Sequence, residues 1–144
     1  MNYTLQFLCI RANHKKYALD IKRIIEVARI GSEGYMAAKG GDGEDVIIYG
    51  KMQLPLRCLA GILFGIDSPP SENRRVLILE FGGQMTGLLV DSVEEILRIG
   101  RDQIGLPEKV PEDLANEFYE GVIKTDEENI YILSFEKLGR MIKV

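Results

Sequence analysis

Short apolar runs alternate with polar or glycine-containing segments along the whole chain of 144 residues. In the run Leu5–Ile10 (LQFLCI), apolar residues occupy both odd-numbered and even-numbered positions, which predicts a strand buried on most of both faces. Two further apolar runs flank Gly82 and Gly83. Glycine accepts the positive φ that tight hairpin turns require. The segment Arg74–Val90 therefore predicts a β-hairpin, which continues into a third apolar segment, Ser92–Ile99.

Further strands are predicted wherever short apolar runs end at turn residues. They cover residues 16–20, 26–30, 46–49, 52–56, 119–124 and 129–134. Periodicity alone leaves Ser92–Ile99 open between strand and helix. The complete pattern predicts about ten short strands, which is typical of small β-barrels.

Helices are predicted where apolar residues recur at spacings of three and four. The spacing indicates one helical turn from Ile21 with Asp20 as its cap, then a helix over Leu56–Phe64 that stops at Gly65. Proline and acidic residues open a third short helix over Pro111–Phe118, and Phe135–Ile142 forms a terminal helix.

Two segments lack any such pattern. Gly31–Asp45 contains five glycines and no large apolar cluster, so it is predicted to be a mobile loop. Asp67–Asn73 (DSPPSEN) is a turn segment between two halves of the chain. Sequence identity reveals no internal repeat between these halves.

Composition fits a folded domain and argues against several functional classes. Apolar residues make up 46% and charged residues 28% of the chain, as in ordinary globular proteins, and this length supports a core. The net charge of −4 opposes binding to nucleic acid. The first apolar run is too short for a signal peptide or a membrane span, so we expect a cytoplasmic protein without membrane insertion.

No residue pattern indicates a cofactor, a metal ion or catalysis. Cys9 and Cys58 are far apart in a chain without a secretory signal, so no structural disulfide is expected. With a single histidine, His14, and no paired cysteines, the chain offers no Cys/His metal site. Glu94 and Glu95 point to opposite faces of a strand, which disfavours an acid/base pair.

Three segments together resemble the CheW-like domain, an adaptor fold of bacterial chemotaxis. They are Tyr17–Val27 (YALDIKRIIEV), Gly87–Ile96 (GLLVDSVEEI) and the closing strands through Tyr131–Leu138 (YILSFEKL). The resemblance covers roughly Tyr3–Arg140 and makes Ser92–Ile99 a strand.

The resemblance implies a mainly β fold of two small SH3-like, five-stranded barrels that share a core and carry short helices. The whole chain, residues 1–144, would be a single domain. Residues 1–66 would form most of the first barrel and residues 74–134 most of the second. A terminal helix, residues 135–142, would pack back on them. The composition agrees, because neither half alone could easily bury enough apolar area.

The resemblance also implies a non-enzymatic adaptor. Its first barrel would bind the regulatory domain of a CheA-type histidine kinase, and the groove between the barrels would bind the cytoplasmic tip of a chemoreceptor. Glu26 falls on the family's glutamate, so Ile24, Glu26 and Val27 are the expected kinase-binding residues. From the residues alone, Ile24 is equally compatible with an exposed interface position and with the core.

Tyr49, Gly50 and Lys51 occupy the place of the family's N-x-R-G receptor-contact motif. The following proline and leucine align, but without a gap the family arginine falls on Gly50, and the family aspartate is Cys58. This difference supports an alternative, in which the chain is a divergent CheW-like interaction module that binds another signalling partner without receptor coupling.

Overall fold

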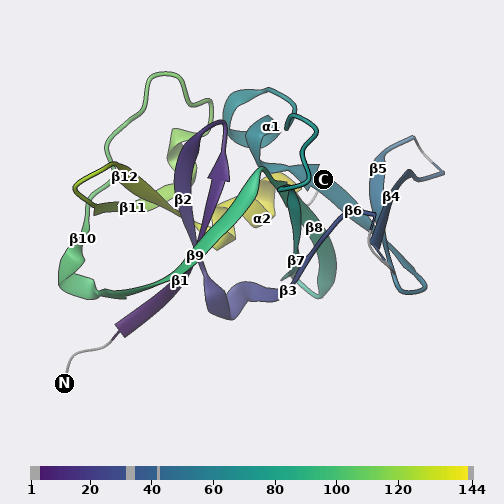
Figure 1. Ribbon diagram of the computed structural model, residues 1–144, viewed down its shortest axis with the longest axis horizontal. Helices are drawn as coiled ribbons and strands as arrows, with labels where there is room; N and C mark the ends of the chain where they lie inside the picture. Colours follow the sequence, from purple (N-terminus) through teal and green to yellow (C-terminus); the bar gives the residue numbers. More distant parts are fainter. Residues whose placement is uncertain (1–3, 32–34, 42, 143–144) are drawn as a thin grey trace.

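The computed structural model describes residues 4–31, 35–41 and 43–142, which form two curved β-sheets side by side (Figure 1). Sheet A has the strand order β10-β11-β12-β2-β1-β9, and sheet B has the order β3-β7-β8-β6-β5-β4. The strands of sheet A are β1 (Thr4–Ala12), β2 (Lys15–Asp20), β9 (Ser92–Gly100), β10 (Ile104–Gly105), β11 (Tyr119–Lys124) and β12 (Asn129–Leu133). The strands of sheet B are β3 (Ile24–Ala28), β4 (Tyr35–Lys39), β5 (Asp45–Tyr49), β6 (Met52–Cys58), β7 (Arg75–Phe81) and β8 (Gln84–Val90).

Helical segments are short. The α-helices are α1 (Leu59–Phe64) and α2 (Phe135–Ile142), and the 3₁₀ helices are η1 (Ile21–Arg23), η2 (Arg101–Gln103) and η3 (Asn116–Phe118). The mainly β fold is confirmed, with six strands in each sheet of the described chain where five were expected.

The two sheets have the same topology, although they divide the sequence differently from the expected split near residues 66–74. Replacing β3–β6 by β9–β12, and β7–β8 by β1–β2, converts the strand order of sheet B into that of sheet A. The parallel pair β6–β8 then corresponds to the parallel pair β12–β2, and α1 corresponds to α2. Sheet A is thus completed by β1 and β2. The strand topology of sheet B is therefore repeated in sheet A.

A shared core explains why some strands are apolar on both faces. The largest buried cluster takes side chains from both sheets and both helices. Alternate residues of β1 and β7 enter this shared cluster, while the residues between them fill the barrel of their own sheet. The residues in the shared core are Leu8, Ile10, Leu77 and Leu79; those inside a single barrel are Phe7, Cys9, Val76 and Ile78. The predicted double burial of the first apolar run is confirmed.

Two predicted turns are confirmed. Gly82 and Gly83 connect β7 to β8 with φ values of 56° and 85°. Gly65 ends α1 with a φ of 73°. The helix begins at Leu59 rather than Leu56, because Leu56–Cys58 pair in parallel with β8.

Two predicted segments need correction. Gly31–Asp45 is not a loop throughout, since β4 pairs with β5 along Tyr35–Lys39 and the Gly40 amide donates to the Glu44 carbonyl at 2.8 Å. Positions 32–34 and 42 of that segment lie outside the described residues. The helix expected over Pro111–Phe118 is reduced to η3.

The Asn116 side chain accounts for the shorter helix. Its Oδ1 accepts from the Val110 amide at 2.8 Å, and its Nδ2 donates to the carbonyls of Val110 and Asp113. The Leu114 amide donates to the Leu63 carbonyl of α1 at 2.6 Å. These bonds fix residues 110–116 as a turn against α1, and the Leu114 side chain stays exposed.

Asp91 joins the two sheets, since it lies between β8 of sheet B and β9 of sheet A. Its carboxylate accepts from the Asn13 amide at 2.8 Å and from the Ser68 hydroxyl at 2.5 Å. Asn13 and His14 form the β1–β2 turn with positive φ values of 51° and 66°. Asp91, the aspartate of the segment GLLVDSVEEI, thus has a structural role. It holds the β1–β2 turn and the segment before β7 at the point where the two sheets meet.

Candidate partner-binding site

The first partner segment predicted from the sequence lies on β3, an edge strand of sheet B. The Asp20 side chain caps η1, as predicted, by accepting from the Lys22 amide at 3.0 Å. The helical turn ends at Arg23, and β3 begins at Ile24, which pairs with Leu79. The register with β7 shifts between Ile24 and Glu26, so β3 contains a β-bulge at this point.

Exposure alternates along β3, and its two exposed apolar residues lie on one side of the strand. Ile25 is 48% exposed and Val27 is 41% exposed. Ile24 is half-buried and packs against the shared core. Ile25 was not among the residues selected from the sequence, although strand alternation places it on the same side as Val27.

The structure brings Glu26 and Tyr49 together, although they belonged to separate predicted segments. The Tyr49 hydroxyl donates to Oε1 of Glu26 at 3.3 Å. Burial, followed by the charge of Glu26 and this hydrogen bond, raises the pKa of Tyr49 above its usual value. Gly50, with a φ of 62°, then turns the chain into exposed Lys51.

We call Ile25, Glu26, Val27, Tyr49, Gly50 and Lys51 the β3 face. It contains two exposed apolar side chains beside one carboxylate and one ammonium group. Apolar residues with a polar rim are typical of protein interfaces.

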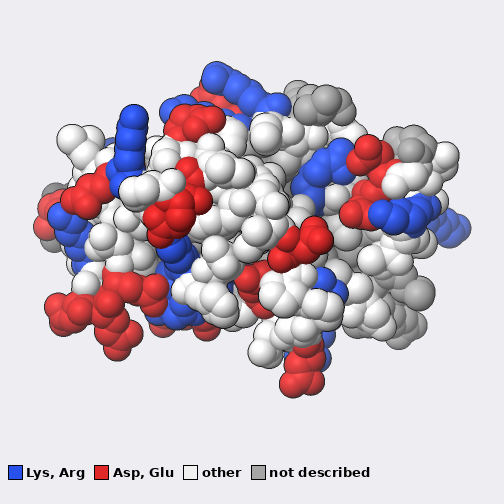
Figure 2. All heavy atoms as spheres, turned by 90° about the horizontal axis from the view of Figure 1, so that it is seen from above, with Lys and Arg blue, Asp and Glu red and all other residues white. Residues whose placement is uncertain are grey.

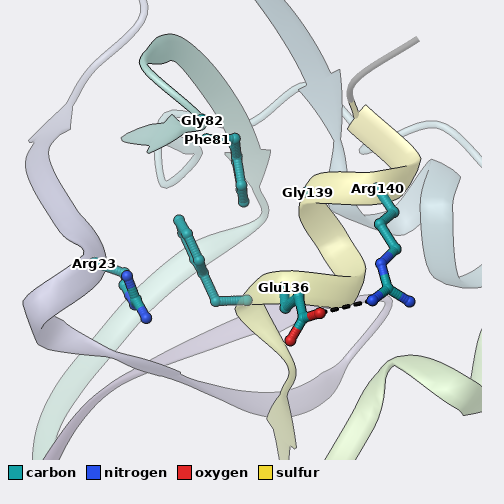
Figure 3. Close-up of a pocket in the computed structure, with 7 residues that line it drawn as sticks. Arg23, Phe81, Gly82, Glu136, Gly139 and Arg140 are labelled. Atoms are coloured by element: carbon teal, nitrogen blue, oxygen red, sulfur yellow. Dashed lines mark hydrogen bonds and ion pairs between the residues drawn. The ribbon is translucent and has the colours of Figure 1, made fainter.

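A second feature is a groove of about 410 Å³ between η1, the β7–β8 turn and α2. We call it the inter-sheet groove, since η1 links sheet A to sheet B and α2 follows the last strand of sheet A. It is lined by Arg23, Phe81, Gly82, Phe135, Glu136, Gly139 and Arg140. Figure 3 shows Arg23 on one side of the groove and the α2 residues on the other.

Aromatic rings form the floor of the inter-sheet groove. Phe81 and Phe135 stack with ring centroids 4.3 Å apart and an interplanar angle of 16°. The Arg23 guanidinium carbon lies 4.8 Å from the centroid of Phe135. On the other wall, Arg140 donates to Glu136 at 2.6 Å (Figure 3). The groove therefore offers an apolar surface with a cation beside it.

Charges elsewhere do not gather into a nucleic-acid-binding surface on the face in Figure 2, where basic and acidic side chains are interspersed. Within the described ranges, no group of three or more His, Cys, Asp or Glu residues could hold a metal ion. Cys9 and Cys58 are free. No helix in the described part of the chain is long and apolar enough to cross a membrane.

The acidic residues near β9 have structural partners. Glu94 accepts from the Arg11 guanidinium at 2.5 Å, and Arg11 also pairs with Glu128 at 3.1 Å. Asp91 accepts the two bonds at the sheet junction described above. These groups connect β1, β9 and the β11–β12 turn, and they do not converge on a reaction site.

Comparison with known proteins agrees with this architecture. The family model of the CheW-like domain matches residues 6–143. Among solved structures, the scaffolding protein TtCheW from Thermoanaerobacter tengcongensis superposes with a TM-score of 0.78 at 26% identity, covering 94% of this chain and 88% of that chain. No curated protein matches in a sequence search.

The two sheets fit a fold of two SH3-like β-barrels with a shared core. The chain belongs to the CheW-like domain family, whose members are scaffold and adaptor proteins of chemotaxis signalling.

Proposed function

We propose that this protein is a non-enzymatic, cytoplasmic adaptor that couples a CheA-type histidine kinase to the cytoplasmic tip of a chemoreceptor. The kinase regulatory domain binds the β3 face at Ile25, Glu26 and Val27, which Ile24 supports from the core side. The receptor binds at Tyr49, Gly50 and Lys51 and extends along the inter-sheet groove. Partner binding shifts the kinase between conformations by as much as the two conformations differ in affinity.

The observation that carries this proposal is the Tyr49–Glu26 contact. It links the strand that bears the family glutamate to the segment in the place of the receptor-contact motif, so the two binding regions adjoin. Two exposed apolar side chains on the same short strand supply the anchors that a protein interface needs.

Calorimetric titration with the regulatory domain of the CheA-type kinase encoded nearest this protein tests the proposal. Val27→Asp and Glu26→Lys should each weaken binding at least about tenfold, since they place a charge on an apolar anchor or reverse one beside it. Val27 is preferable to Ile24 as a target, because Ile24 packs against the shared core.

Ile96→Asp is the matched control. Ile96 is 53% exposed on β9, the edge strand of sheet A that corresponds to β3. This variant introduces the same charge outside the β3 face and should bind like the wild type. If the wild type does not bind the kinase domain at high micromolar concentration, the adaptor proposal is wrong. Kinase binding without binding to a chemoreceptor fragment would instead favour the divergent module, for which the altered segment Tyr49–Lys51 is the supporting feature.

A further inference from the structure

The turn over residues 110–116, between β10 and η3, buries a carboxyl group that gains no hydrogen bond from the protein. Asp113 is 4% exposed, and neither of its carboxyl oxygens has a hydrogen-bond partner among the described residues. The hydroxyl of Tyr17 on β2 is also buried without such a partner. Burial, followed by the charge of Asp113, raises the pKa of this hydroxyl, so the two groups are neighbours. An ionised carboxylate here loses water and gains no donor in exchange.

The 110–116 turn holds its own shape. The three hydrogen bonds of the Asn116 side chain all go to Val110 and Asp113, inside the turn. The Asp113 amide donates to the Val110 carbonyl at 3.0 Å, which closes the turn again from within. On its N-terminal side, residues 105–109 are exposed. The turn can therefore move as a unit relative to the rest of the protein.

The contacts that attach this turn to the neighbouring elements are fewer. The Leu114 amide donates to the Leu63 carbonyl of α1 at 2.6 Å. Glu112 pairs with Lys15 at the start of β2, and an ion pair between such exposed groups contributes little. The side chains of Val110 and Ala115 lie in the shared core. One backbone bond and two small apolar contacts thus oppose the cost of the buried carboxyl group.

Asp113 is the acid near this turn that changes charge in the mildly acidic range. Burial raises its pKa from 3.8 to about 6; the charge of Lys15 lowers it, and that of Glu112 raises it. α1 contains no titratable residue. Exposed carboxyl groups ionise at about pH 4, whereas tyrosine and lysine lose their protons only at about pH 10. The titratable groups on the other elements around the turn are Lys15 and Tyr17 on β2, Glu112 in the turn, Glu117 on η3, Tyr119 on β11 and Tyr131 on β12.

We propose that the 110–116 turn is a pH-sensitive latch, which lies closed on α1 and β2 while the Asp113 carboxyl group is protonated and opens when that group ionises. Opening moves the carboxylate into water and uncovers Val110 and Ala115. Because the closed turn binds the proton more tightly than the open turn, a rise in pH favours the open turn. The difference between 3.8 and about 6 makes opening up to about a hundredfold more favourable at high pH than at low pH. The latch is independent of kinase and receptor binding.

Hydrogen exchange of the Leu114 amide measures opening, because its bond to Leu63 exists only in the closed turn. The Leu138 amide is the reference, since it donates to the Ser134 carbonyl at 3.0 Å within the fully buried part of α2. Protection factors, which remove the intrinsic effect of pH on exchange, are compared at about pH 4.5 and about pH 7.5. Protection at Leu114 should fall at least about tenfold more than at Leu138. An equal fall at both amides would mean that Asp113 reaches water only by global unfolding, which overturns the proposal.

Three variants assign the effect to one side chain. Asp113→Asn keeps the shape of the side chain without its charge, so Leu114 should stay protected across this pH range. Glu112→Gln removes the adjacent carboxylate, and His14→Asn removes the imidazole next to Lys15. Asparagine suits position 14, where φ is 66°. Both controls should keep most of the wild-type pH dependence. If Asp113→Asn keeps that dependence as well, or if either control abolishes it, the latch is wrong.

A ¹³C NMR titration of the Asp113 carboxyl group tests the wild type without any substitution. Its chemical shift should change with a midpoint above about pH 5, as expected for a group that is buried while protonated. A midpoint at or below about pH 4.5 would mean that the closed turn accommodates the charge. That result overturns the proposal even if Asp113→Asn does not fold.

Discussion

Gly87 offers a direct test of the close packing inside sheet B. It lies on β8 opposite Ile78 of β7 and beside Leu56 of β6. A Cβ atom placed on it would lie 2.9 Å from Cγ1 of Val76 and 3.0 Å from Cγ2 of Ile47. Val76 and Ile47 are fully buried, so neither can move into solvent. The strand keeps a glycine here because three strands leave no room for a side chain.

Two opposing effects set the magnitude. Replacing glycine by alanine usually stabilises a protein by about 0.4–1 kcal/mol through the unfolded chain. Overpacking a filled core costs about 1–3 kcal/mol. We therefore expect Gly87→Ala to lower the free energy of unfolding by about 1 kcal/mol and Gly87→Val by about 2–3 kcal/mol. For a chain of this size, each kcal/mol corresponds to roughly 3 °C in the melting midpoint.

Urea unfolding of each variant, together with thermal melting, measures these changes. Gly105→Ala is the control, since Gly105 also lies in a strand but its Cβ would meet Val122 at an ordinary 3.7 Å. We expect that control to stay within about 0.5 kcal/mol of the wild type. If Gly87→Ala is as stable as the wild type, the reasoning about close packing is wrong.

Two further predictions concern Asp113 and Gly139. Asp113 is 4% exposed, and burial raises its pKa from 3.8 to about 6. The unfolded chain loses this proton at lower pH than the folded chain, so the free energy of unfolding should fall as pH rises from about 4 to about 6. Asp113→Asn should remove up to about 3 kcal/mol of this pH-dependent loss. If urea unfolding gives parallel pH profiles for the variant and the wild type, this prediction is wrong. Gly139→Ala should lower the free energy of unfolding by about 1–2 kcal/mol, because the added Cβ meets the ring of Phe81, although alanine is the better helix former. A higher melting midpoint than that of the wild type would contradict this prediction.

The sequence allows the individual strands to be predicted better than their partners. Runs of alternating residues identify most strands, and Gly82 with Gly83 identifies a hairpin, because these signals are local. The assignment of β1 and β2 to sheet A depends on pairing with β9 and β12, which lie more than seventy positions further along the chain. Local patterns carry no information about such distant partners, so the expected division of the chain differs from the observed one.

The strand β4 could not be found from its own residues. Ala37 and Ala38 are exposed and supply no apolar alternation, and glycines surround the segment. Pairing with β5 holds it in place, with Ala37 opposite Ile47 and Ala38 opposite Val46. Tertiary pairing here overrides a local composition that is typical of loops.

The candidate site shows the same limit. Glu26 and Val27 could be selected from the resemblance, and the structure places Val27 in solvent. Ile25 is exposed on the same side of β3 as Val27, but the resemblance did not single it out. The inter-sheet groove assembles Arg23, Phe81 and Phe135 from three separate segments, none of which has a motif that names the others.

The arrangement of η1 and β3 has a consequence for how the two binding surfaces could influence each other. Arg23 lines the inter-sheet groove, Ile24 packs against the shared core, and Ile25 belongs to the exposed β3 face. Three consecutive residues thus connect both surfaces to the core. Such proximity supplies no coupling free energy by itself, because a ligand shifts an equilibrium only through its different affinities for two states. Under the proposed function, if occupation of the groove changes the affinity of the β3 face for the kinase domain, the kinase domain must change receptor affinity by the same factor.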